Sequence, residues 1–155
     1  MNVTDGHGVV DDANPPFRFR LRTPIEIVDT DLGGIVYYGR YSVLADRGVV
    51  AYRRHLGIPA LGVDGHYFVV RRMEVDYLSP ARFEEAVDVW VRTPEIGRTS
   101  HVNEVAINDA ETGQPRCRLR VVLVGVAGYE VSRPTRVPED LAARLRAFED
   151  GTGGG

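Results

Sequence analysis

Two acidic residues, Asp29 and Asp31, stand one residue apart at the end of a strand-like run. A glycine pair, Gly33 and Gly34, follows, and after four apolar or aromatic residues a segment with helical spacing begins. A carboxylate can act as a general base or as a nucleophile, and backbone N–H groups at a helix start can stabilise the negative charge of an acyl-transfer intermediate. A carboxylate beside a tight turn and a helix start therefore indicates hydrolysis of an acyl compound.

The composition argues against several other chemistries. All 19 basic residues are arginine, so no lysine is present to form a Schiff base or act as a nucleophile. Cys117 is the single cysteine and the four histidines are scattered, so we expect no disulfide, no metal site and no cofactor. The net charge of −3 gives no general attraction to nucleic acid. Because the sequence shows neither a membrane-length apolar run nor a secretory signal, we expect a cytoplasmic protein without stable membrane insertion.

The elements that must position Asp31 can be read from the hydrophobic spacing. Apolar and arginine residues alternate over 17–22, which is typical of a strand, and the apolar pattern resumes with Ile25 and Ile27. Residues 38–56 have helical spacing, and Gly57 and Pro59 end the helix. One face of this helix is formed by Tyr41, Leu44, Ala45, Gly48, Tyr52 and Leu56. A glycine in mid-helix predicts close contact with a sheet at Gly48.

Four further strand-like segments, at 67–77, 86–93, 99–109 and 116–126, precede a short helix at 139–148. Their short connections predict antiparallel neighbours. A single long helix must cover the apolar face, so we predict an α+β fold in which a curved antiparallel sheet wraps around one central helix. We expect flexible tails at 1–16 and 149–155 around a single domain at 17–148. Exposed strand edges favour a dimer whose sheets join edge to edge.

Two segments carry a family resemblance. Residues 29–41, Asp-Thr-Asp-Leu-Gly-Gly-Ile-Val-Tyr-Tyr-Gly-Arg-Tyr, resemble the active-site segment of hot-dog-fold acyl-CoA thioesterases of the 4-hydroxybenzoyl-CoA thioesterase type. Residues 68–82 are similar to the bacterial acyl-CoA thioesterases associated with the Tol-Pal system. The resemblance covers about residues 17–138. It implies a hot-dog fold, assembly into homodimers or homotetramers, and an active site at the dimer interface beside the start of the central helix.

The resemblance also implies roles for individual residues. Asp31 matches the catalytic aspartate of the family, which either attacks the thioester carbonyl or activates a water molecule, and the sequence leaves both roles open. Asp29 is then the structural acid. Tyr38 occupies the position whose backbone N–H polarises the thioester carbonyl, so its side chain need not take part.

Further positions are expected to bind the substrate. Four apolar or aromatic residues could shape an acyl pocket or belong to the core: Tyr37, Tyr41, Phe68 and Val70. By family position, Arg98 and Arg133 are candidates for binding the phosphates of CoA, because the planar guanidinium matches phosphate geometry. The sequence does not identify the acyl group.

Three alternatives compete with hydrolysis of acyl-CoA. An acyl dehydratase of the same fold would need a histidine near the helix start, and none lies between Arg18 and Arg54. A thioesterase acting on acyl carrier protein in fatty-acid or polyketide metabolism would use the same catalytic residues. A non-catalytic acyl-CoA-binding protein would not need a carboxylate at the thioester, so Asp31 distinguishes it from an enzyme.

Overall fold

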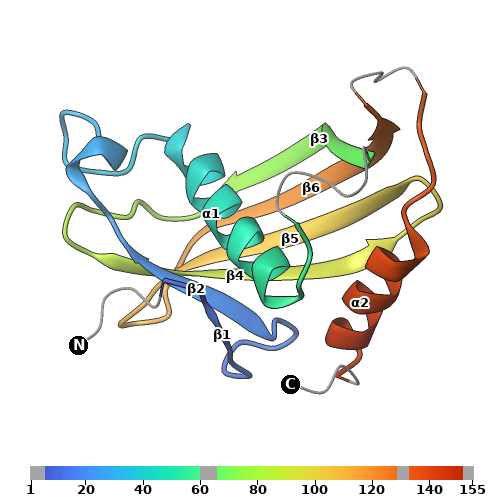
Figure 1. Ribbon diagram of the computed structural model, residues 1–155. Coiled ribbons are helices and arrows are strands. Elements are labelled where there is room, and N and C mark those ends of the chain that lie inside the picture. The colour runs from blue at the N-terminus through green and yellow to red at the C-terminus, as the bar shows by residue number, and fades with distance from the viewer. Residues whose placement is uncertain (1–5, 60–65, 129–132, 152–155) are drawn as a thin grey trace.

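A long helix lies across one face of an antiparallel sheet in the computed structural model, which describes residues 6–59, 66–128 and 133–151 (Figure 1). The predicted α+β hot-dog architecture is confirmed. The sheet has six strands in the order β1-β2-β4-β5-β6-β3. The elements are β1 (Val9–Val10), β2 (Phe19–Pro24), the 3₁₀ helix η1 (Ile27–Asp29), α1 (Arg40–His55), β3 (His66–Tyr77), β4 (Ala86–Ile96), β5 (Ser100–Asp109), β6 (Pro115–Ala127) and α2 (Glu139–Glu149).

Helix α1 packs its predicted apolar face onto the sheet. Tyr41, Leu44 and Tyr52 are each at most 4% exposed. A Cβ atom added to Gly48 would lie 2.4 Å from Val89 Cγ1 on β4, so the expected close contact with the sheet is confirmed. The helix begins two residues later than predicted. The preceding residues form a turn in which the N–H of Arg40 donates to the carbonyl of Tyr37 at 2.8 Å.

The prediction that the last four strands are all neighbours in succession is wrong for β3. This strand pairs with β6 at the edge of the sheet, and β4 lies between β2 and β5. Eight residues, 78–85, join β3 to β4, which is long enough to pass beneath the start of α1 instead of turning back as a hairpin. Ala81 marks the crossing, since it is fully buried and its N–H donates to Tyr41 Oη at 3.1 Å.

Two boundaries differ from the sequence reading. Ile27 was expected to continue the first strand, yet it belongs to η1 and is 69% exposed. Part of the expected tail at 1–16 pairs with the sheet, since β1 runs antiparallel to β2 and Asp11 accepts a hydrogen bond from Arg20 Nε at 2.9 Å. Side-chain charge pairing thus holds the segment before Phe17 to the sheet. Residues 1–5 and 152–155 of the expected tails lie outside the described residues.

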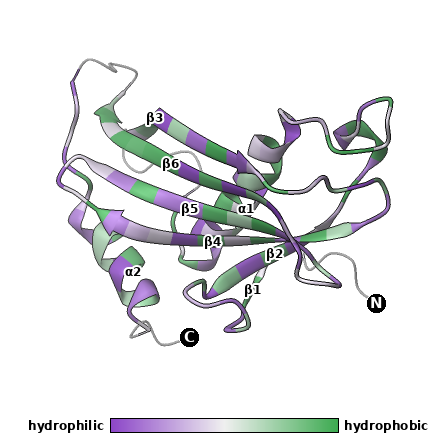
Figure 2. Ribbon diagram, turned by 180° about the vertical axis from the view of Figure 1, so that it is seen from behind, coloured by the Kyte–Doolittle hydropathy of each residue, from purple (hydrophilic) through white to green (hydrophobic). Residues whose placement is uncertain are grey.

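The sheet face away from α1 alternates polar and apolar residues, as Figure 2 shows from behind. Arg22 donates to Asp88 at 2.7 Å and Arg92 to Glu104 at 2.8 Å, so ion pairs run across neighbouring strands. In the described part of the chain, no helix is long and apolar enough to cross a membrane. The apolar core lies between the sheet and α1, so the start of α1 and the loop beside it become the place to look for chemistry.

Candidate active site

Asp31 opens a tight turn that ends at Ile35. Its N–H donates to the Ile35 carbonyl at 2.9 Å, and its own carbonyl accepts from the N–H of Gly34 at 3.1 Å. Gly34 has a φ of 76°, a left-handed conformation that glycine adopts without strain. The N–H of Gly33 donates to Asp31 Oδ1 at 2.8 Å, so the turn fixes one carboxylate oxygen. Asp31 remains exposed to solvent, which leaves the carboxylate accessible to a reactant.

The far limb of this turn is tied to the crossing segment between β3 and β4. The N–H of Val36 donates to the Ala81 carbonyl at 2.9 Å, and the N–H of Phe83 donates to the Gly34 carbonyl at 3.1 Å. Ile35 forms an isolated bridge with Arg82. The second sequence motif therefore ends against the first one. The two segments that carried the family resemblance meet in space, although about fifty residues separate them along the chain.

The start of α1 presents two backbone N–H groups beside this turn. The N–H of Tyr37 donates to the Asp29 carbonyl at 2.9 Å, and the N–H of Arg40 donates to the Tyr37 carbonyl. Within residues 6–59, 66–128 and 133–151, the N–H groups of Tyr38 and Gly39 donate no backbone hydrogen bond. A helix N-terminus carries partial positive charge on such N–H groups, so these two can donate to an oxyanion.

Aromatic rings line the surface next to these N–H groups. The rings of Tyr37 and Tyr38 lie 4.5 Å apart, and Tyr77 at the end of β3 lies 6.4 Å from Tyr38. Tyr41 is 4% exposed and belongs to the core, where burial raises the pKa of its hydroxyl. Tyr77 was missed by the sequence reading. The signal was present in the period-two spacing, which puts Tyr77 on the same sheet face as Val75, towards the helix.

Asp29 differs from Asp31 in the burial of its carboxylate and in the partners that occupy its two oxygens. Its side chain is fully buried and forms an ion pair with Arg40, whose Nη2 lies 2.8 Å from Asp29 Oδ1. Its Oδ2 accepts the N–H of Glu26 at 2.9 Å. A buried and fully hydrogen-bonded carboxylate supports the loop and is closed to a substrate. This geometry is what the sequence reading expected for the structural member of the acid pair.

Phe68 and Val70 lie far from Asp31 within one chain. Phe68 and Tyr77 are nine positions apart on β3, a span of about 30 Å in an extended strand. Phe68 packs against His101, with ring centroids 4.6 Å apart, near the other end of the sheet. In Figure 1 the segment between β2 and α1 lies at the left of the sheet, and β3 begins at the right. A single chain therefore brings Tyr37 and Tyr38 to Asp31 but leaves Phe68 and Val70 apart from it.

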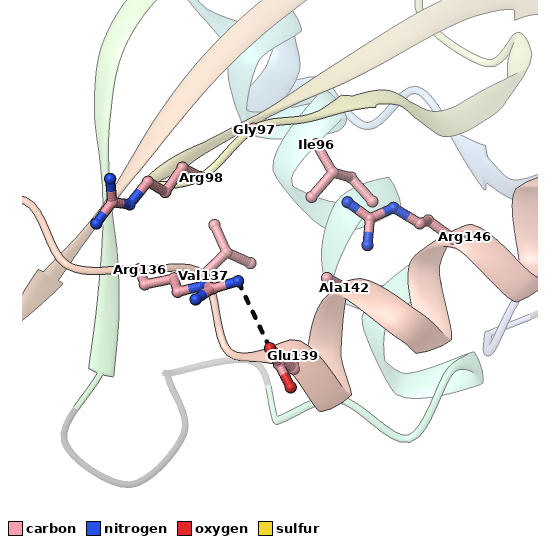
Figure 3. A pocket seen from close by; sticks show the side chains of 8 residues that line it. All are labelled: Ile96, Gly97, Arg98, Arg136, Val137, Glu139, Ala142 and Arg146. Carbon is pink, nitrogen blue, oxygen red and sulfur yellow. Dashed lines mark ion pairs between the residues drawn. The ribbon is translucent and has the colours of Figure 1, made fainter.

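Arg98 also lies at the far end, where it lines a cavity of about 570 Å³ between the β4–β5 turn and α2 (Figure 3). Arg136 and Arg146 line the same cavity, and the sequence reading had missed both. Arg136 forms an ion pair with Glu139 at 3.5 Å, and the Arg98 carbonyl accepts the N–H of Val137. Three arginines against one acid, Glu139, give the lining of this cavity an excess of positive charge. Arg133 lies three positions before Arg136 in the sequence. Its side chain is exposed and does not line this cavity.

Strand β3 forms one edge of the sheet and exposes apolar side chains along its length. Val70 is 57% exposed, and Met73 and Tyr77 are also exposed. An exposed apolar edge strand is a surface that pairs readily with another strand. The Tyr77 end of this edge adjoins the start of α1, so the edge and the candidate site are continuous.

Comparison with known proteins gives concordant matches. A family model described as the thioesterase superfamily matches residues 33–115. The acyl-CoA thioester hydrolase YbgC of Escherichia coli is 34% identical over 132 residues, which cover 84% of this chain and 96% of that protein. The protein of the same name from Shigella flexneri matches to the same extent.

Solved structures agree with the sequence matches. A thioesterase from Thermus thermophilus, determined in complex with coenzyme A and Zn, is 32% identical with a TM-score of 0.72, covering 84% of this chain and 94% of that one. A 1,4-dihydroxy-2-naphthoyl-CoA thioesterase from Synechocystis has a TM-score of 0.75 at 14% identity, with 84% and 96% coverage. At that identity the second structure supports the fold alone.

Proposed function

Because this chain belongs to the thioesterase superfamily, we propose that it hydrolyses acyl-CoA thioesters and that Asp31 is the reacting carboxylate. The observation that carries the proposal is the exposed Asp31 carboxylate in the same loop as the N–H groups of Tyr38 and Gly39. A carboxylate and a pair of oxyanion donors are the two parts that acyl transfer needs. The bound coenzyme A of the Thermus thermophilus relative supports CoA as the carrier.

The geometry suggests how the residues act on a bound thioester. The carbonyl oxygen accepts hydrogen bonds from the N–H groups of Tyr38 and Gly39, which polarises the carbonyl carbon. The Asp31 carboxylate then either attacks that carbon, expelling the CoA thiolate and leaving a mixed anhydride that water hydrolyses, or takes a proton from the water that attacks. Both routes yield the free acid and CoA. The helix N-terminus stabilises the developing negative charge in each.

Replacing the carboxylate tests the role of Asp31. We expect Asp31→Asn to lose most turnover, measured as release of free thiol from short, long and aromatic acyl-CoAs, while circular dichroism and oligomeric state stay unchanged. Asp12→Asn, an exposed acid of the N-terminal segment, is the matched control and should keep wild-type turnover. An Asp31→Asn enzyme with near-native kcat would refute the assignment. If the wild-type protein hydrolyses acyl groups only when they are attached to acyl carrier protein, it is an acyl-carrier-protein thioesterase and not an acyl-CoA thioesterase.

A proline substitution tests the oxyanion donor at Tyr38. Tyr38 is the second residue of the turn that Arg40 closes, and proline is favoured at that position of a β-turn. Tyr38→Pro removes the N–H, and we expect kcat to fall by about 10²–10³. Tyr38→Phe keeps the N–H and removes only the hydroxyl, so its kcat should stay close to wild type. Equal losses in both variants would assign the effect to the side chain and overturn the backbone role.

We also propose that two chains pair along β3 and complete the site. In an antiparallel pairing about a two-fold axis, the Phe68 end of one β3 lies opposite the Tyr77 end of the other. Phe68, Val70 and Arg98 of the partner subunit would then approach Asp31. Val70→Lys should yield monomers with low activity in analytical ultracentrifugation and kinetics. Val10→Lys, on the opposite edge strand β1, is the control that should leave assembly intact. A fully active Val70→Lys monomer would refute the shared site.

The arginine-lined cavity gives the proposed CoA phosphates a place to bind. Arg98, Arg136 and Arg146 surround it, and their charge suits phosphate groups that lie far from the thioester. In a β3-paired dimer this cavity and the Asp31 turn of the partner subunit lie at the same end of the joined sheet. The acyl group and the phosphates would then contact different subunits.

A further inference from the structure

One ion pair closes the loop that carries both proposed reacting groups. Arg40 donates from Nε at 3.1 Å and from Nη2 at 2.8 Å to the same oxygen, Asp29 Oδ1. Glu26 donates its N–H to the other oxygen, Oδ2, at 2.9 Å. Asp29 has no exposed surface, and the Arg40 side chain is 27% exposed. Both carboxylate oxygens are therefore occupied, and the pair is held at the boundary between core and solvent.

The two partners stand at the two ends of the reacting loop. Asp29 ends η1 two residues before Asp31, and Arg40 begins α1 two residues after Tyr38. The Asp29 carbonyl also accepts the N–H of Tyr37. From these contacts we propose that Arg40 is a positioning residue for thioester hydrolysis, and that its ion pair with Asp29 fixes the Asp31 carboxylate relative to the N–H groups of Tyr38 and Gly39. This inference rests on the proposed function.

Other contacts in the loop do not replace this one. The hydrogen bonds from Val36 to Ala81 and from Phe83 to Gly34 fix the far limb of the turn to the β3–β4 crossing, which in turn contacts α1 through the Ala81 N–H that donates to Tyr41 Oη. The tip of the turn packs on nothing, since Leu32 is fully exposed. Residue 29 instead makes direct contacts between the Asp31 segment and the start of the helix, through its carbonyl and its carboxylate. A displacement of about 1 Å between reacting groups can lower a rate by about 10²-fold.

Arg40→Met removes the charge and both donors while keeping the length of the aliphatic chain. We expect kcat to fall by about 10²-fold with KM within about threefold of wild type, because the substrate still binds but reacts poorly. Arg40→Lys keeps the charge but not the planar fork and should recover about tenfold of the loss. Arg47→Met removes an arginine from the same helix, away from the loop, and should keep wild-type kcat.

A double variant separates positioning from stability. Arg40→Met leaves the buried Asp29 carboxylate without a cation, which lowers the melting temperature and could unfold the protein under the assay conditions. Asp29→Asn combined with Arg40→Met removes both charges, so the melting temperature should recover towards wild type. If Arg40 positions Asp31, kcat of the double variant stays low. Recovery of kcat together with stability would overturn the inference.

Two further outcomes would also overturn it. An unchanged kcat in Arg40→Met shows that the loop holds Asp31 without the ion pair, and a raised KM at unchanged kcat shows that Arg40 contacts the substrate instead. Asp31→Asn measured in parallel distinguishes these failures from failure of the proposed function. If Asp31→Asn keeps turnover, the proposed chemistry fails. If Asp31→Asn is inactive and Arg40→Met is fully active, only the positioning role fails.

Discussion

In the variant Gly48→Ala, the higher helix propensity of alanine stabilises the protein, whereas the clash of the added methyl group with β4 destabilises it. In the interior of a helix, alanine is favoured over glycine by about 1 kcal/mol. The added Cβ, however, would lie 2.4 Å from Val89 Cγ1 and 3.1 Å from Val91 Cγ2. Both valines are fully buried in β4 under the helix, so neither can turn away into solvent.

The net effect follows from the two magnitudes. Overpacking of a filled core typically costs about 1–3 kcal/mol, and a contact this short falls at the upper end. Subtracting the helix gain of about 1 kcal/mol leaves a destabilisation of about 2 kcal/mol. For a domain of this size such a change lowers the melting temperature by about 4–8 °C. The variant should also shift α1 away from β4 by a fraction of an ångström.

Chemical and thermal denaturation of Gly48→Ala, Val89→Ala and the double variant measure the clash directly. Val89→Ala alone should be destabilised because it leaves a cavity, whereas in the Gly48→Ala background it makes room for the new methyl group. The loss of stability in the double variant should therefore be smaller than the sum of the losses in the two single variants. A Gly48→Ala protein that melts at or above the wild-type temperature would refute the reasoning, because helix propensity would then outweigh the contact.

Three other predictions follow from separate parts of the structure. Neutralising Arg98 and Arg146 together to alanine should raise KM for acyl-CoA more than it lowers kcat in steady-state assays, and an unchanged KM would remove both from the phosphate site. Burial lowers the pKa of His101 to about 4, so the folded protein binds fewer protons than the unfolded chain between that value and about 6.5. The stability contributed by neutral His101 is thus complete above about pH 6.5 and is lost as pH falls towards 4. Urea unfolding of the wild type and His101→Leu between pH 4 and 7 should show a steeper acid loss in the wild type. Tyr52→Phe removes the buried hydroxyl that donates to the half-buried carboxylate of Glu149 and should cost about 1–3 kcal/mol by thermal denaturation, and an unchanged melting temperature would contradict this role.

The elements that could be predicted were those whose signal is local. The helical spacing around Tyr41 to Tyr52 and the alternation in the later strands depend on neighbours within a few residues, and the observed bounds differ from the predicted ones by only a few positions. The placement of β3 could not be read in this way. Its pairing with β6 depends on which strands meet across the sheet, and a short connection to β4 favoured the wrong neighbour.

The residues of the candidate site also fall into two groups, those with a local sequence signal and those without one. Asp31 and the backbone donor at Tyr38 were predicted because they belong to one short motif with a recognisable chemistry. Arg136 and Arg146 carry no local signal that separates them from ordinary surface residues, whereas the alternation along β3 does place Tyr77 on the helix side of the sheet. Arg136 and Arg146 share a cavity with Arg98 only because α2 folds back against the β4–β5 turn.

By itself the sequence determined the central helix, the family and the candidate loop at 29–41, since each depends on residue types at fixed spacing along the chain. Only the tertiary structure decided which acid is buried and which is free. Asp29 and Asp31 have the same carboxylate and lie two residues apart, yet Arg40 reaches back across the loop to cover one of them. Burial and ion pairing depend on what packs around a side chain, and for these two acids that is set by the contact between η1 and the first residue of α1.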